Sequence, residues 1–93
     1  MKPRAFRSVW DALEDTPEGA ANMKVRAEIL IAIQERVRKQ KGTQAEKASR
    51  LDVTQPRLND LLQGRIDKFS LDSLVNIAER AGLRIDFRIR NAA

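Results

Sequence analysis

Residues 43–64, TQAEKASRLDVTQPRLNDLLQG, decide the fold, because they read as two short helices joined by a tight turn. Thr43 and Glu46 have the S/T-x-x-E spacing of a capping box, which predicts that the first helix begins there. Asp52 follows that helix and is a residue type that tolerates the left-handed conformation needed to leave it. Since only about three residues separate the two helices, we expect them to cross steeply rather than lie side by side.

The second helix of this stretch has equally clear ends. Thr54 is a good N-cap, Pro56 falls in the first turn where a missing N–H costs nothing, and Gly64 is placed to end the helix. Its apolar positions repeat at i, i+3 and i+4 as Leu58, Leu61 and Leu62. Together the two helices predict a helix-turn-helix, whose second helix can enter a DNA major groove.

Capped amphipathic helix pairs also occur in all-α proteins that bind no DNA, so the spacing alone leaves a purely structural role open. The polar residues of the second helix favour DNA. Gln55, Arg57 and Asn59 are types that hydrogen-bond base edges or phosphates, whereas a structural helix more often exposes Glu and Lys.

The stretch resembles the Xre/Cro phage-repressor family. The matching residues are Gln44, Ala45, Glu46, Ala48, Leu51, Val53, Thr54, Gln55, Leu58, Leu61 and Gly64. It departs from that family at Asp52, where Gly is usual, and at Pro56, where many relatives carry a polar residue. The resemblance implies an all-α, lambda-repressor-like helix-turn-helix bundle. With the tail described below, we expect about five helices and a short C-terminal β-strand.

The same resemblance implies which residues meet DNA. Gln55 would be the strongest base reader, since its amide can pair with adenine, and Arg57 would pair with guanine or hold a phosphate. The full base-reading set is Gln55, Arg57, Asn59 and Asp60. The expected phosphate contacts are Thr43, Gln44, Thr54, Arg65 and Lys68. Gln44 would also support the Gln55 side chain.

Composition limits the other possibilities. The chain has 93 residues, a net charge of +5, no His and no Cys, which predicts one small domain without disulfides or thiolate metal sites. Because the commonest general base is missing and no Gly-rich phosphate loop is visible, we expect neither an enzyme nor a cofactor. No apolar run has the length of a membrane span and no signal peptide is visible, so we expect a soluble cytoplasmic protein.

Charge divides the chain unevenly. Residues 11–18 hold four acidic and no basic side chains, whereas residues 24–41 hold six basic and two acidic ones. The basic stretch belongs to a long helix expected from about Pro17 to Lys41, and it suits DNA phosphates as well as the helix dipole. We expect residues 16–82 to form the helix-turn-helix domain.

Residues 1–15 are expected to be a mobile segment with a short acidic helix. Its one Trp, at position 10, either folds back on the domain or belongs to a docking peptide for a basic partner. By the second interpretation the docking residues are Val9, Trp10, Asp11, Leu13 and Glu14.

The last segment, residues 83–93, changes period. Leu83, Ile85, Phe87 and Ile89 alternate with charged residues, which predicts a half-buried β-strand. A single strand needs a partner for its backbone groups: an N-terminal segment, another protein or a twin copy. We favour a homodimer through these four apolar residues, because repressors of the resembled family read two half-sites.

Over about residues 6–90 the chain is similar to small Xre-type antitoxins, which are encoded beside RelE-like toxins. That similarity implies two roles: binding operator DNA to repress a shared promoter, and neutralising a small basic toxin. Two alternatives remain open at this point. A stand-alone phage-type repressor would have no toxin partner, and a protein-interaction module would tolerate the loss of Gln55 and Arg57.

Overall fold

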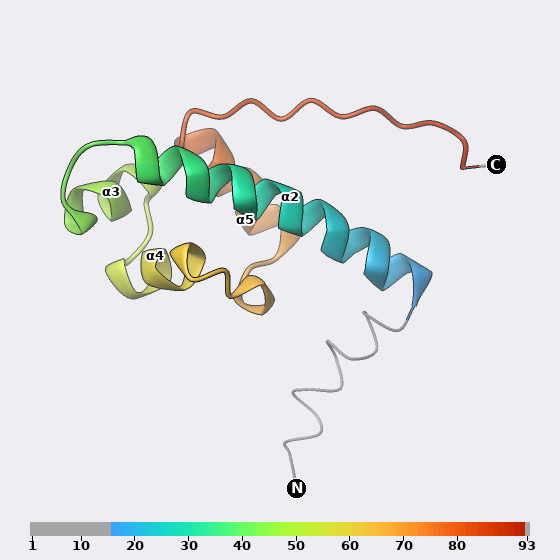
Figure 1. The fold of residues 1–93 in the computed structure, drawn as a ribbon, viewed down its shortest axis with the longest axis horizontal. Helices are drawn as coiled ribbons and strands as arrows, with labels where there is room; N and C mark the ends of the chain where they lie inside the picture. Colours follow the sequence, from blue (N-terminus) through green and yellow to red (C-terminus); the bar gives the residue numbers. More distant parts are fainter. Residues whose placement is uncertain (1–15, 93) are drawn as a thin grey trace, which may run out of the picture.

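A computed structural model describes residues 16–92 of the chain. Within them the fold is all-helical, with a long helix crossed by three shorter ones (Figure 1). The elements are α2 (Pro17–Lys39), α3 (Gln44–Leu51), α4 (Gln55–Leu62), the single 3-10 turn η1 (Ile66–Lys68) and α5 (Leu71–Arg80). The long helix ends two residues before the predicted Lys41.

Helix α2 is the element on which the others assemble. Thr16 caps its first turn, where the hydroxyl oxygen accepts a hydrogen bond from the Gly19 N–H at 2.9 Å. Its inner side packs mainly on α5 and also meets α4 and η1. Arg26 lies buried within this side and donates from Nη1 to the Phe69 carbonyl at 3.1 Å. A charged side chain of α2 thus ties the η1 loop to the core.

The core is formed where α4 and α5 pack on α2 and α3 packs on α4 and α5. Ala48 is 3% exposed, and its small side chain allows α3 and α4 to cross closely. The buried apolar residues are Leu30, Ile33, Val37, Ala48, Leu51, Leu58, Leu61, Phe69, Leu74, Ile77, Ala78 and Ala81.

The predicted helix-turn-helix is confirmed by the backbone of residues 43–64. Thr43 and Glu46 form a complete capping box, and the Thr54 hydroxyl caps α4 by accepting from the Arg57 N–H. Asp52 adopts the left-handed conformation, with φ of 56°. It is the one non-Gly residue with positive φ in the described chain, and it stands where the turn requires that geometry.

Two expectations about secondary structure are not met. The count of about five helices is not supported, since residues 16–92 contain four α-helices, and the short acidic helix expected within residues 1–15 lies outside the described residues. The C-terminal β-strand is wrong for the single chain. Residues 83–92 have no regular secondary structure and run as an extended segment beside α2 (Figure 1). The reason is that no partner strand exists for them within residues 16–92.

Candidate nucleic-acid interface

Helix α4 presents exposed polar side chains beside its buried face. Leu58 and Leu61 are each 1% exposed and anchor the helix to the core. Gln55 and Asn59 are exposed, and because they are four residues apart they lie on one face of the helix. The pattern places two amides, which can both donate and accept hydrogen bonds, one turn apart at the start and the middle of α4, with Asn59 Oδ1 accepting from Gln63 Nε2 at 3.4 Å.

The C-terminal end of α4 is held by side chains from α2. Gln34 donates from Nε2 to the Leu61 carbonyl at 2.9 Å and to the Leu62 carbonyl at 3.4 Å. Arg38 donates to the same Leu62 carbonyl at 3.2 Å. The last carbonyls of a helix have no partner within the helix, so these bonds fix where α4 points. Sequence reasoning missed them, because it assigned the basic end of α2 to its own dipole and to phosphates.

Arg57 does not share the face of Gln55 and Asn59. Two residues along a helix correspond to a rotation of roughly 200°, which turns Arg57 toward the η1 loop. Its guanidinium carbon lies 4.4 Å from the centroid of the Phe69 ring, and Nη1 donates to the Lys68 carbonyl at 3.4 Å. These contacts give Arg57 a structural role in joining α4 to the loop that follows it. Its predicted base contact stays a prediction.

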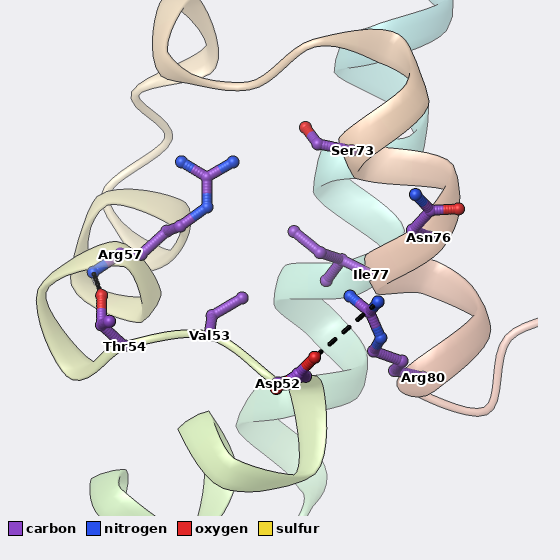
Figure 2. Close-up of a pocket in the computed structure, with 8 residues that line it drawn as sticks. All are labelled: Asp52, Val53, Thr54, Arg57, Ser73, Asn76, Ile77 and Arg80. Carbon is purple, nitrogen blue, oxygen red and sulfur yellow. Dashed lines mark hydrogen bonds and ion pairs between the residues drawn. The ribbon is translucent and has the colours of Figure 1, made fainter.

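A cleft of about 250 Å³ separates the helix turn from α5 (Figure 2). Arg57 lines one wall, and Ser73, Asn76 and Arg80 of α5 line the other. Arg80 lies 3.9 Å from the carboxylate of Asp52, and both side chains are well exposed. Such an ion pair contributes little to stability. The cleft is open and of mixed lining, with Val53 and Ile77 beside the polar residues, and it lies beside the amide face of α4 rather than within it.

The two threonines proposed for phosphate contact are both N-caps. The hydroxyl of Thr43 accepts from the Glu46 N–H at 3.1 Å, and Glu46 accepts from the Thr43 N–H at 2.8 Å. The backbone and side-chain hydrogen bonds that the Glu46 carboxylate receives from Thr43 hold the pKa of that carboxyl below its usual value. The Thr54 hydroxyl accepts from the Arg57 N–H and keeps its own proton as a donor for a phosphate oxygen. Gln44 is exposed at the first position of α3, and no hydrogen bond joins it to Gln55 within residues 16–92.

The remaining predicted DNA residues surround the end of α4. Asp60 is paired with Arg65 at 3.4 Å, and its side chain is 21% exposed against 51% for Arg65. The pairing holds the Asp60 carboxylate toward the loop, where its negative charge is partly neutralised. Lys68 is exposed in η1. Arg65 and Lys68 therefore lie on the loop that follows α4, and their contacts with phosphates stay a prediction.

The other predicted surfaces lie away from α4. Val9, Trp10, Asp11, Leu13 and Glu14 fall outside the described residues. In the tail, Leu83 packs partly against the core, Ile85 is 38% exposed, and Phe87 and Ile89 are 80% and 85% exposed. Among residues 16–92 there is no acidic, His or Cys cluster able to hold a metal ion, and no helix is long and apolar enough to cross a membrane.

Comparison with known proteins agrees with this geometry. Residues 12–90 match the model of a family described as a helix-turn-helix domain, so the match extends well beyond α3 and α4 on both sides. Among curated proteins no match is found.

Proposed function

We propose that this chain, which belongs to the helix-turn-helix domain family and is a DNA-binding regulator, is the antitoxin of a toxin–antitoxin pair and represses its own promoter. The observation that carries DNA readout is the amide face of α4. Gln55 and Asn59 are exposed on one side of a helix that Leu58 and Leu61 anchor in the core. Such a helix can enter the major groove with its N-terminal half at the base edges.

In this proposal the two kinds of DNA contact have different residues. Gln55 reads one base pair through its amide, with Asn59 and Asp60 further along the groove. Thr43, Gln44, Thr54, Arg65 and Lys68 hold phosphates and carry no sequence information. Arg57 acts at the edge of the interface, because its guanidinium is engaged with Phe69 and the Lys68 carbonyl.

Readout is tested on an operator selected from a random duplex library. Gln55→Ala should lose about 1–3 kcal/mol at one base pair, whereas Lys68→Ala should weaken all sequences alike and lower the salt slope by about one. The measurement is fluorescence anisotropy on operator and scrambled duplexes across a salt series. Equal losses on both duplexes for Gln55→Ala would remove this residue from the reading set. Full tolerance of Gln55→Ala and Arg57→Ala would favour a protein-interaction module.

A homodimer completes the proposal for DNA. Two copies related by a two-fold axis would present two α4 helices to half-sites about 34 Å apart. The exposed apolar residues of the tail, Phe87 and Ile89, support a contact between copies. In Figure 1 the tail and α4 lie on opposite sides of α2, so a tail contact leaves the amide face of α4 uncovered.

The toxin is the second proposed partner. Residues 8–18 combine Trp10 and Leu13 with four carboxylates, a composition suited to a small basic protein. Support for this partner comes from the resemblance to antitoxins and from this charge.

The toxin proposal is tested by purifying the tagged chain from its native cells, both in full and beginning at Thr16. The shortened chain keeps the N-cap and all of α2, and comparing its urea unfolding with that of the full chain separates loss of the docking residues from unfolding. We expect a stoichiometric basic protein with the full chain only. If the shortened chain retains the partner, the antitoxin proposal stands, but the docking site lies outside residues 1–15. If only operator DNA co-purifies with the full chain and with the shortened chain, while the neighbouring gene is expressed, the protein is a stand-alone repressor.

A further inference from the structure

The tail leaves apolar side chains in water on one side only. Ile85, Phe87 and Ile89 occupy alternate positions, and Phe87 and Ile89 are more than three-quarters exposed. The positions between them are Asp86 and Arg88, and Arg84 and Arg90 flank them. An extended segment with this period has one apolar and one charged face. In a monomer, Phe87 and Ile89 on the apolar face stay exposed to water.

The helices beside the tail expose a matching apolar surface. Val25 of α2 is 46% exposed and Val75 of α5 is 40% exposed. With Ile29 and Leu71 they form the floor of a groove of about 470 Å³, and residues 85–89 of the tail form its wall. The space between floor and wall is large enough for further apolar side chains.

The backbone N–H and C=O groups of the tail also lack backbone hydrogen-bond partners. The Leu83 N–H donates to the Ala78 carbonyl at 3.0 Å, and beyond it no backbone–backbone hydrogen bond within residues 16–92 involves residues 84–92. An extended segment with a free row of N–H and C=O groups is a template for another strand.

We infer that the tail of a second copy occupies this groove, paired antiparallel with the first tail about a two-fold axis at Phe87. The inference rests on the proposed homodimer and names the surface and the register that form it. Both surfaces belong to the same chain, so one contact satisfies both copies, as an isologous interface requires. The paired tails form a two-stranded ribbon whose apolar face covers the grooves and whose charged face stays in water.

The register follows from which residues oppose each other. An axis at Phe87 places Phe87 against its twin and Ile85 against Ile89 of the other copy, so every exposed apolar residue of the tail meets an apolar one. On the charged face it places Asp86 against Arg88 of the other copy, twice, and also Arg84 against Arg90, twice. Directly opposed residues on a sheet interact, and opposite charges there are favourable.

Neighbouring registers lose one of these matches. An axis at position 86 opposes two Asp86 side chains and sets Arg84 against Arg88, so like charges meet three times. An axis at position 85 pairs Arg84 with Asp86 but leaves Ile89 beyond the paired region. It also requires Leu83, which already packs against the core of its own copy. An axis between two residues would oppose apolar to charged positions throughout.

Cross-linking tests the register directly, because the natural chain has no Cys. Under a mild oxidant Phe87→Cys should form a disulfide-linked dimer, since Cβ atoms opposed across a strand pair approach disulfide distance. Ile85→Cys alone and Ile89→Cys alone should not, because each lies about 13 Å along the strand from its twin, four residues at about 3.3 Å each. A mixture of these two variants, with one copy tagged, should link as the heterodimer.

Charge reversal tests the same register without new cysteines. Asp86→Arg and Arg88→Asp should each weaken the dimer roughly tenfold in dissociation constant, and the double variant should restore it. Arg90→Asp is the control of opposite sign: it replaces the like-charge contact with Arg84 of the other copy and should tighten the dimer. Sedimentation equilibrium at low salt measures the dimer dissociation constant of the three single or double variants at positions 86 and 88 and of Arg90→Asp.

The outcomes separate the inference from the DNA-binding proposal. Cross-links at position 85 or 89 alone, links at every position alike, or failure of the double charge variant to recover would overturn the register. A monomer at every concentration would overturn the tail contact itself. Base discrimination by Gln55 on a half-site duplex would stand in each case. Conversely, a Phe87-linked dimer that binds no selected duplex would keep the tail contact and reject DNA readout.

Discussion

Residues 43–64 and residues 83–92 differ in how completely the chain satisfies them. In the helix-turn-helix, capping side chains and α2 partners satisfy the helix ends, and the leucines facing the core are almost fully buried. In the tail, the backbone groups and the apolar side chains Phe87 and Ile89 both face water. The groups of residues 43–64 find their partners within the chain, whereas we infer that those of the tail find theirs in a second copy.

The difference fits two separate demands on a DNA-binding regulator. A helix that reads base edges must be rigid before it meets DNA, because small displacements lose hydrogen bonds. A contact that sets the distance between two reading helices can be supplied by the second copy. The comparison predicts that changes in residues 43–64 alter the monomer, whereas changes in the tail alter only the assembly.

The largest expected effect comes from the core of α3. Leu51 is fully buried, so Leu51→Ala should lower the free energy of unfolding by about 2–5 kcal/mol at any protein concentration. Ile89→Ala removes a similar side chain that is 85% exposed. It should leave the monomer unchanged and cost stability only as the concentration approaches the range of dimer formation.

Urea unfolding at two protein concentrations a hundredfold apart measures both variants. A concentration-independent loss for Ile89→Ala would show that the tail belongs to the fold of the single chain. A cost below about 1 kcal/mol for Leu51→Ala would show that α3 is not held as its burial indicates.

The next effect concerns the hydrogen bonds that α2 gives to α4. Gln34→Ala leaves the Leu61 and Leu62 carbonyls without the Gln34 amide, and should cost about 1 kcal/mol of unfolding free energy. Operator affinity should also fall, because the helix end loses an anchor. Glu35→Ala, an exposed neighbour, is the control. Equal unfolding free energies for the two variants would mean that water replaces the Gln34 bonds without loss.

Much of the region around residues 43–64 is predictable because its signals are local. The caps at Thr43 and Thr54 and the left-handed Asp52 depend on residues within a few positions of each other, and all three are observed. The family match over residues 12–90 agrees with the wider resemblance at the level of a helix-turn-helix domain. It does not test the antitoxin role or the individual DNA contacts.

What the sequence could not show depends on contacts between distant residues. The bonds from Gln34 and Arg38 to the end of α4 span 27 and 24 positions, and no local pattern marks them. Arg57 carries the same residue-type signal as a base reader, but its partner Phe69 decides its direction. In the tail the local pattern is clear but the partner is absent. A period of two predicts a strand correctly only if a second strand is present to pair with it.

The turn between α3 and α4 gives a smaller effect of opposite sign. Asp52 has φ of 56°, where Gly is favoured. Asp52→Gly should therefore raise the free energy of unfolding by about 0.5–1 kcal/mol, with loss of only a weak exposed ion pair to Arg80. Asp52→Val should be destabilising, because a β-branched residue is strained there. A destabilised Asp52→Gly variant in thermal unfolding would show that the Arg80 contact matters more than the backbone.

The smallest effect is a dependence on pH at the capping box. The hydrogen bonds from Thr43 lower the pKa of Glu46 from its usual 4.5. A carboxylate with a depressed pKa in the folded state adds stability above the unfolded value, and that stability is lost as pH falls through the folded pKa. Glu46→Gln keeps an oxygen that can accept from the Thr43 N–H but cannot titrate. The wild type should therefore exceed this variant in stability at pH 7 and approach it as the pH falls through the folded pKa of Glu46. Glu35→Gln, at an exposed site, is the matched control variant. If the gap between wild type and Glu46→Gln stays constant from pH 7 to pH 3, the capping bond does not depend on the charge of Glu46.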